Sequence, residues 1–184
     1  CGAKGDMFTF VQEIEGLNFR EALKVLADKA GVEIEYRPEA LKERTEKDKI
    51  RETLETATLF FEKELEKSKE AQKYLSSRGI NEDSIRNWRL GYAPAEWRSL
   101  YQHLLSLGYK KELLLKAGLI KIIEGKDPYD VFRDRIIFPI CDSSGAVCAF
   151  SGRGSEPKYL NTPETILFHK SEVLYGLDKA KESI

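Results

Sequence analysis

The spacing of apolar residues changes near residue 119 of this 184-residue chain, and the change limits the folds available to it. Before that point, apolar residues recur every three or four positions, a spacing typical of amphipathic helices. The clearest set comprises Ile50, Leu54, Ala57, Phe61, Leu65 and Leu75. After that point, residues 135–140 and 146–152 form β-rich runs. Helices followed by strands predict an α+β fold with a helical N-terminal half and a small, mostly antiparallel β-sheet.

Capping and turn residues predict where the elements begin and end. Asn18, followed three residues later by a glutamate, resembles a capping box for a helix that stops at Ala30–Gly31, and a shorter helix precedes it. A long helix is expected to run from residue 50 to Arg78–Gly79, and Asn81 is expected to cap a short one. Further helices are expected near 97–107 and 110–117, and strands near 120–123, 135–140, 146–152 and 158–160, with a turn at 142–145.

Residues 37–48, with the sequence RPEALKERTEKD, have alternating charges, one proline and few large apolar side chains. Such a segment is either a linker or the solvated start of a helix. The preceding segment is small, and its apolar residues need a partner surface. We therefore divide the chain into a segment 1–36, a linker 37–48 and a main unit 49–184.

Charge and cysteine content exclude several classes of protein. Lys and Arg number 30 and Asp and Glu 31, a balance that excludes a bulk polycation but allows a local basic groove. No apolar run approaches the roughly 20 residues of a membrane span, and the start CGAKGDMFTF lacks the features of a signal peptide. The three cysteines, Cys1, Cys141 and Cys148, are widely spaced, which favours a reducing compartment, the cytoplasm. Cys141 and Cys148 are interpreted as core residues of neighbouring strands.

Basic residues recur between residues 131 and 170. Arg133 and Arg135 lie two positions apart, which would place them on one face of a strand. Arg153 would leave the partner strand, and Lys158 and Tyr159 would begin the next. If these strands form one sheet, the cations either converge into a nucleic-acid groove or form ion pairs at the surface. Tyr159 is correspondingly either a base-stacking residue or part of the core.

Other motifs that carry chemistry are weak in this sequence. There is no Walker-type loop and no G-x-G-x-x-G, and neither of the two histidines lies in a triad or a metal motif. The break Gly152–Arg153–Gly154 indicates a strand end or a bulge. Asp127, Asp130 and Asp134 are closely spaced, but surface or salt-bridge roles are favoured over a metal cluster.

The stretch FRDRIIFPICDSSGAVCAFSGRG and the following PKYLNTPETILFHKSEVLYGLDKA are long, ordered motifs. They resemble the motifs of one family, the bacterial DNA primases of the DnaG type. Upstream, YLSSRGI, WRLGYAP and KAGLI are similar to the entrance of its polymerase domain. The opening CGAKGD, together with FREALKVLADKAGVEI, resembles the end of its zinc-ribbon domain.

The resemblance implies a function for each part of the chain. Residues 1–36 would be the C-terminal end of the zinc-ribbon domain, and 49–184 the N-terminal subdomain of the RNA polymerase core, leading into a toprim fold outside the chain. The whole enzyme would be a nucleotidyltransferase, a DNA-directed RNA polymerase that makes short RNA primers on single-stranded DNA during replication. Its partners would be ribonucleoside triphosphates, the RNA–DNA hybrid, the replicative helicase and single-strand binding protein, with no membrane. The alternative is a non-polymerising adaptor that binds nucleic acid or a helicase.

The resemblance also carries site residues over to this sequence. The family's template contacts correspond to Arg78, Arg133, Arg135, Arg153, Lys158, Tyr159, Asn161 and Lys170. Cys1 corresponds to the last zinc ligand, and the other three ligands of a tetrahedral structural site are absent from the chain. The carboxylates that bind catalytic Mg²⁺ or Mn²⁺ would lie beyond Ile184. No catalytic residue is therefore assigned, and the chain alone is expected to be a template-binding module without activity.

Overall fold

The computed structural model describes residues 5–15, 19–32 and 38–180, and its contacts divide the chain into two units between Glu43 and Arg44. The first unit contains two helices that pack against each other, with the rings of Phe8 and Phe19 5.5 Å apart. Both helices confirm the prediction: they are α1 (Met7–Glu15) and α2 (Phe19–Ala30). Asn18, the expected cap of the second helix, lies outside the described residues.

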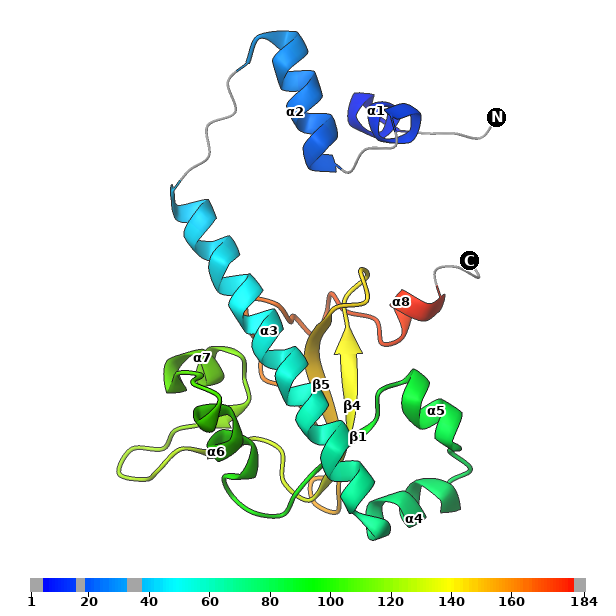
Figure 1. Ribbon diagram of the computed structural model, residues 1–184, viewed down its shortest axis with the longest axis vertical. Helices are drawn as coiled ribbons and strands as arrows, with labels where there is room; N and C mark the ends of the chain where they lie inside the picture. The colour runs from blue at the N-terminus through cyan, green and yellow to red at the C-terminus, as the bar shows by residue number, and fades with distance from the viewer. Residues whose placement is uncertain (1–4, 16–18, 33–37, 181–184) are drawn as a thin grey trace. The chain divides into compact units, whose positions relative to one another are not determined.

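The sequence left residues 37–48 as either a linker or the solvated start of a helix. The structure has the helix, because the long helix α3 (Pro38–Lys67) contains residues 38–48. In the second unit, α3 lies along the sheet that contains β4 and β5 (Figure 1). Its apolar stripe faces the core, as predicted, and the buried members are Ile50, Leu54, Ala57, Phe61 and Leu65. Burial of this stripe, rather than helix propensity alone, stabilises the helix.

The helix predicted to run unbroken to residue 78 is interrupted at Ser68, so that prediction was wrong. Ser68 is extended (φ −90°, ψ 94°), and its side chain accepts a hydrogen bond from the amide of Ala71, which begins α4 (Lys69–Ser77). The Gln72 side chain donates to the carbonyls of Leu65 and Glu66, at 2.9 and 2.8 Å. Carbonyls in the last turn of a helix lack the partners that a further turn would supply, and the Gln72 amide takes that place here. Apolar spacing continues across the break, which is why periodicity did not reveal it.

The main sheet has four antiparallel strands in the order β1-β4-β5-β6. Three of them confirm predicted strands, and their bounds are β4 (Arg135–Cys141), β5 (Val147–Arg153) and β6 (Tyr159–Asn161). The fourth, β1 (Gly91–Ala93), and the small pair formed by β2 (Ile120–Lys121) and β3 (Tyr129–Asp130) complete the β-structure of the described residues. Sequence periodicity missed β1 and β3 because they are only three and two residues long.

Helices pack on both faces of the main sheet. Neighbouring residues of a strand point to opposite sides, so Ile136 and Ile137 of β4 lie in two different cores. Ile137 packs in the larger core with α3 and with two predicted helices, α6 (Ser99–Ser106) and α7 (Lys111–Lys116). Ile136 packs in a second core with α4 and α5 (Glu82–Asn87). Asn81 caps α5 as predicted, accepting a hydrogen bond from the amide of Ser84 at 2.8 Å. The α+β fold class is therefore confirmed.

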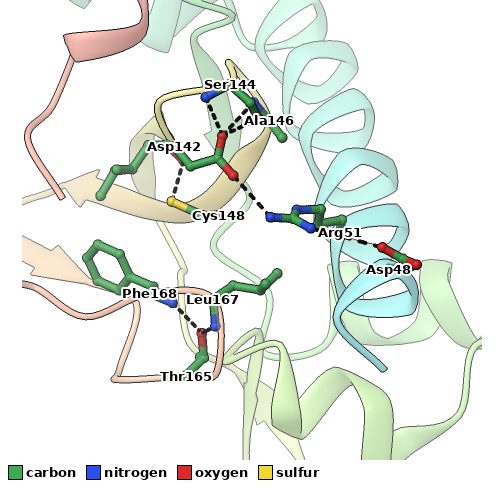
Figure 2. A network of polar contacts seen from close by, with 10 residues as sticks. Asp48, Arg51, Asp142, Ser144, Ala146, Cys148, Thr165, Leu167 and Phe168 are labelled. Carbon is green, nitrogen blue, oxygen red and sulfur yellow. Dashed lines mark hydrogen bonds and ion pairs between the residues drawn. The ribbon is translucent and has the colours of Figure 1, made fainter. Parts of the chain in front are cut away.

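The predicted turn at 142–145 joins β4 to β5 and is tied to α3 (Figure 2). One carboxylate oxygen of Asp142 accepts hydrogen bonds from the amides of Ser144 and Ala146, while the other lies 3.2 Å from the guanidinium of Arg51. Cys148 is buried in β5 and donates to the carbonyl of Ile140, and Cys141 is half-buried in β4. The two cysteines lie in neighbouring strands, as the sequence indicated.

The C-terminal segment lies against Trp88, the residue that follows α5. The rings of Trp88 and Tyr175 stack at 5.3 Å with 15° between their planes, and the ammonium of Lys179 in α8 (Leu177–Ala180) lies 5.4 Å from the Trp88 ring. These contacts connect the described end of the chain to the α4–α5 side of the sheet. Within residues 5–15, 19–32 and 38–180, no helix combines the length and the apolarity that a bilayer span needs.

Candidate nucleic-acid interface

Arg153 at the end of β5 joins a helix to an edge strand. Its Nε donates to the hydroxyl of Tyr74 in α4 at 2.5 Å, and its Nη1 donates to the hydroxyl of Tyr159 in β6 at 2.6 Å. The guanidinium carbon also lies 5.7 Å and 5.4 Å from the centroids of these two rings. We call Tyr74, Arg153 and Tyr159 the arginine–tyrosine cluster. Two phenols that hold one guanidinium fix its orientation, so less side-chain entropy is lost when it binds an anion.

The arginine–tyrosine cluster lies at the open edge of the sheet. Tyr159 is 59% exposed, which excludes the interpretation that it is a core residue. The ammonium of Lys158 lies 5.6 Å from the Tyr159 ring, and Lys158 and Asn161 are both exposed. The cations Arg153 and Lys158 and the exposed ring of Tyr159 therefore lie together where β5 ends and β6 begins. Tyr74 was missed by the sequence interpretation, because only the tertiary fold brings it to a residue 79 positions away.

Arg135 does not belong to this exposed surface. It is 8% exposed, and its guanidinium donates to the backbone carbonyls of Pro157 and Glu156 at 2.6 and 2.9 Å. The expectation that Arg133 and Arg135 share one face of a strand was wrong: β4 begins only at Arg135, and the intervening Asp134 has φ 48°. Arg135 therefore holds the loop that leads into Lys158.

The Gly152–Arg153–Gly154 motif marks a close approach as well as the end of β5. A Cβ atom on Gly152 would lie 2.8 Å from the Phe132 ring, and one on Gly154 would lie 2.8 Å from the guanidinium of Arg135. Both distances are shorter than packed atoms tolerate. The two glycines therefore leave room for the side chains of Phe132 and Arg135, which are both buried.

Arg133 lines a different recess from Arg153. It donates to the carbonyl of Asp130, and its guanidinium lies 4.3 Å from the ring centroid of Trp97 and 5.2 Å from that of Tyr129. Two recesses meet near Asp134. One is lined by Tyr74, Tyr92, Arg153 and Ser155, and the other by Trp97, Tyr129, Arg133, Ser155 and Pro157. Ser155 belongs to both, so the recesses adjoin.

Arg78 and Lys170 are exposed and lie outside the arginine–tyrosine cluster. Arg78 is the C-cap of α4, four residues after Tyr74, so it belongs to the same helix end. Lys170 follows β6, and its backbone amide donates to a carboxylate oxygen of Glu164 at 3.2 Å. The structure thus places most of the expected template contacts on exposed surface, but only Arg153, Lys158 and Tyr159 of that set in direct contact.

The three aspartates near residue 130 have separate partners. Asp127 pairs with Arg98 at 3.0 Å, and Asp134 accepts from the hydroxyl of Tyr92 at 2.9 Å. Asp130 is 2% exposed and accepts hydrogen bonds from the amides of Leu100 and Tyr101, both at 2.9 Å. It therefore caps α6 from a distant strand, a role that neither expected alternative described. Burial raises the pKa of Asp130 to about 6.

Among the residues that the structure describes, no three His, Cys, Asp or Glu side chains gather closely enough to hold a metal ion. Cys1, the expected zinc ligand, lies outside those residues. Residues 1–42 contain one cysteine and no histidine, so the side chains present do not supply the four ligands of a structural zinc site.

An arginine–aromatic surface on a helical and antiparallel scaffold is typical of a nucleic-acid-binding module. The family model of the DNA primase catalytic core, N-terminal domain, matches residues 60–181, and that of the CHC2 zinc finger matches residues 1–42. The DNA primases of Deinococcus radiodurans and Clostridium acetobutylicum are 42% and 40% identical over 100% and 98% of this chain. The chain belongs to the DnaG-type bacterial DNA primase family. It spans about a third of the length of these two relatives, 32% and 31%.

Solved primase structures have the same fold. The Aquifex aeolicus primase, with zinc-binding and RNA polymerase domains, matches with a TM-score of 0.70 and 32% identity, covering 100% of this chain and 45% of that one. A DnaG primase catalytic domain bound to single-stranded DNA matches with a TM-score of 0.69 and 32% identity, over 76% of this chain and 47% of that one. The RNA polymerase domain of the Mycobacterium tuberculosis primase matches with a TM-score of 0.69 and 36% identity, over 74% and 47%.

Proposed function

We propose that this chain supplies the template-binding surface of a replicative primase that synthesises short RNA primers on single-stranded DNA. The observation that carries the proposal is the arginine–tyrosine cluster, with Lys158 beside it, at the exposed edge of the sheet. A fixed guanidinium neutralises phosphate, and the exposed Tyr159 ring offers a stacking surface to any base. Contacts of this kind bind single-stranded DNA with little sequence preference, as priming at many sites requires.

The proposal includes parts of the protein that this chain does not contain. Mg²⁺ or Mn²⁺ would be held by carboxylates of a toprim subdomain that follows residue 184. Zinc would be held by Cys1 together with ligands outside the chain. Ribonucleoside triphosphates, the RNA–DNA hybrid, the helicase and single-strand binding protein are proposed partners of the whole enzyme, in the cytoplasm. Residues 1–36, 37–48 and 49–184 remain the proposed divisions of the chain.

Single-stranded DNA binding should weaken steeply as salt rises. Each phosphate contact contributes about −0.7 to the slope of log affinity against log salt, so four or five contacts give about −3. Replacing both Arg153 and Lys158 by Ala should flatten the slope by about 1.4 and weaken all sequences alike. Fluorescence anisotropy of a labelled oligonucleotide, titrated at several salt concentrations, measures both effects.

A matched control removes the same charge elsewhere. Lys110 and Lys111 are exposed at the start of α7, outside the arginine–tyrosine cluster, and their double Ala variant should retain the parental slope. Equal slopes for the parent and a folded Arg153→Ala, Lys158→Ala variant would remove these two residues from the interface.

The 184-residue chain alone should make no primer from a DNA template, ribonucleotides and Mg²⁺. The reason is that the carboxylates proposed to bind the catalytic metal would follow residue 184, outside this chain. Denaturing gels with a labelled ribonucleotide measure the product. Template-dependent RNA from a preparation free of other polymerases would place catalytic carboxylates within this chain and overturn that part of the proposal.

A further inference from the structure

A recess of about 760 Å³ is lined by the C-terminal end of α3, by α4 and by α5. We propose that it is the docking site for a basic amphipathic helix of a partner protein. We call it the acidic recess, after the glutamates Glu62, Glu66 and Glu82 that line it. It shares no lining residue with the recess beside Tyr74 and Arg153, so the proposal does not depend on the template-binding function.

The floor of the acidic recess consists of side chains of the second core. Leu65 and Leu90 are 3% and 4% exposed, and Ile80 and Ile85 are half-buried and pack against the same core. Apolar side chains of an occupant would be removed from water on this floor, which is favourable in proportion to the area covered. The recess therefore suits an occupant with an apolar stripe.

Side-chain contacts hold the walls of the recess in place. The Gln72 side chain of α4 donates to the carbonyls of Leu65 and Glu66 in α3. On the other side, the Nε of Arg89, two residues after α5, donates to the carboxylate of Glu62 in α3 at 3.0 Å. Both walls are thus tied to the same helix end, and a groove that is formed before binding loses less conformational entropy when a partner occupies it.

The charge of the rim identifies the kind of partner. The charged side chains that line the recess, together with their ion-pair partners, are Glu62, Glu66, Glu82, Asp83, Arg86 and Arg89. Four of these are acidic and two are basic, so two negative charges are in excess. Lysine or arginine side chains beside an apolar stripe would complement such a rim, whereas the phosphates of a nucleic acid would be repelled.

The lining residues favour a helix over other forms of peptide. Among the described residues that line the acidic recess, none belongs to a strand and none is aromatic. A peptide that adds a strand needs a sheet edge, and a proline-rich peptide needs a groove lined by aromatic rings. A groove with an apolar floor between helices instead receives the apolar face of an amphipathic helix.

The two sides of α4 would serve two different ligands. Residues two positions apart in a helix point about 200° apart around its axis. Gln72 and Ser76 line the acidic recess, while Tyr74 between them contacts Arg153. A helix docked in the acidic recess would therefore leave the arginine–tyrosine cluster accessible.

A synthetic peptide of leucine and lysine tests the proposal. With leucine at every third or fourth position, the peptide forms one apolar and one basic helix face. Anisotropy of its fluorescein-labelled form should show saturable binding to the 184-residue chain. A peptide of the same composition in shuffled order, and one with glutamate in place of lysine, should both bind about tenfold more weakly or worse, because they lack the apolar face or the charge.

Variants of the chain locate the peptide. Ser76→Arg places a bulky cation in the recess, near the C-terminal end of α4, and should weaken peptide binding about tenfold or more. The same change at the exposed Ser106, at the end of α6, should have no effect. Replacing both Glu66 and Glu82 by Gln should weaken binding about fivefold at low salt. The matched control, Glu124→Gln with Glu172→Gln, changes two exposed glutamates outside the recess and should bind like the parent.

Four results would overturn the proposal. The first is that the parent does not bind the amphipathic peptide, and the second is that the shuffled peptide binds equally well, since bulk charge would then explain the binding. The third is parental affinity in a folded Ser76→Arg variant; if that variant does not fold, the Glu66→Gln, Glu82→Gln variant decides in its place. The fourth is loss of peptide binding in the Arg153→Ala, Lys158→Ala variant, which would place the peptide on the template surface.

Discussion

Asp130→Ala is expected to lower the free energy of unfolding by about 2–4 kcal/mol, since a cap and the partners of two buried amides are lost together. The carboxylate accepts from the amides of Leu100 and Tyr101, and the residue is 2% exposed, so water does not replace it at low cost. Urea denaturation followed by circular dichroism measures the change.

Asp130→Asn is the matched control, because it keeps one acceptor oxygen in nearly the same volume and should cost less than the Ala variant. It also isolates the titration of the carboxyl. Burial raises the pKa of Asp130 to about 6, above its value of about 3.9 in an unfolded chain. The folded state then binds more protons between these values, so the stability this group contributes falls as the pH rises from about 4 to 6. The parent should therefore exceed the Asn variant in stability by more at pH 4.5 than at pH 7. A constant difference, or equal stability of all three proteins, would contradict the role given to Asp130.

Gly91→Ala is expected to destabilise the protein by about 1–3 kcal/mol through overpacking. A Cβ atom at this position of β1 would lie 2.5 Å from the Cβ of Phe61 and 2.7 Å from its backbone carbonyl carbon. The obstacle is therefore the main chain of α3, which cannot turn aside as a flexible side chain does. Thermal unfolding measures the effect as a lower Tm.

A second glycine gives the comparison for Gly91. Gly79 follows α4 with φ 77° and has no atom within 4 Å of a built Cβ, so Gly79→Asn should be nearly neutral, since Asn adopts positive φ readily. If Gly91→Ala melts at the temperature of the parent, α3 and β1 do not approach each other as closely as the structure has them.

Long periodic segments were predictable from the sequence, and single contacts were not. The apolar stripe of α3 and the two long strands follow from local patterns that need no knowledge of the fold. The break at Ser68 was missed because the apolar spacing is the same on both sides of it. The short strand β1 was missed because three residues carry too little pattern, and its position is set by pairing with β4.

The candidate interface divides in the same way. Motif resemblance pointed to Arg153, Lys158 and Tyr159, which lie together, and to Arg135, whose guanidinium is buried against backbone carbonyls. Spacing alone placed Arg133 and Arg135 on one face, and the positive φ of Asp134 separates them. Tyr74 and Trp97 could not be found from local sequence, because their partners lie 79 and 36 positions away.

Because the helix is interrupted at Ser68, the place of Tyr74 in the interface depends on how α4 is rotated about its own axis. Residues follow one another by about 100° around a helix axis, so the direction in which Tyr74 points depends on where α4 restarts. Ser68 and Gln72 fix that restart by bonding to Ala71 on one side and to the carbonyls of Leu65 and Glu66 on the other. Chain length between Phe61 and Tyr74 is therefore constrained more tightly than residue identity, because one residue more or less would turn the phenol away from Arg153.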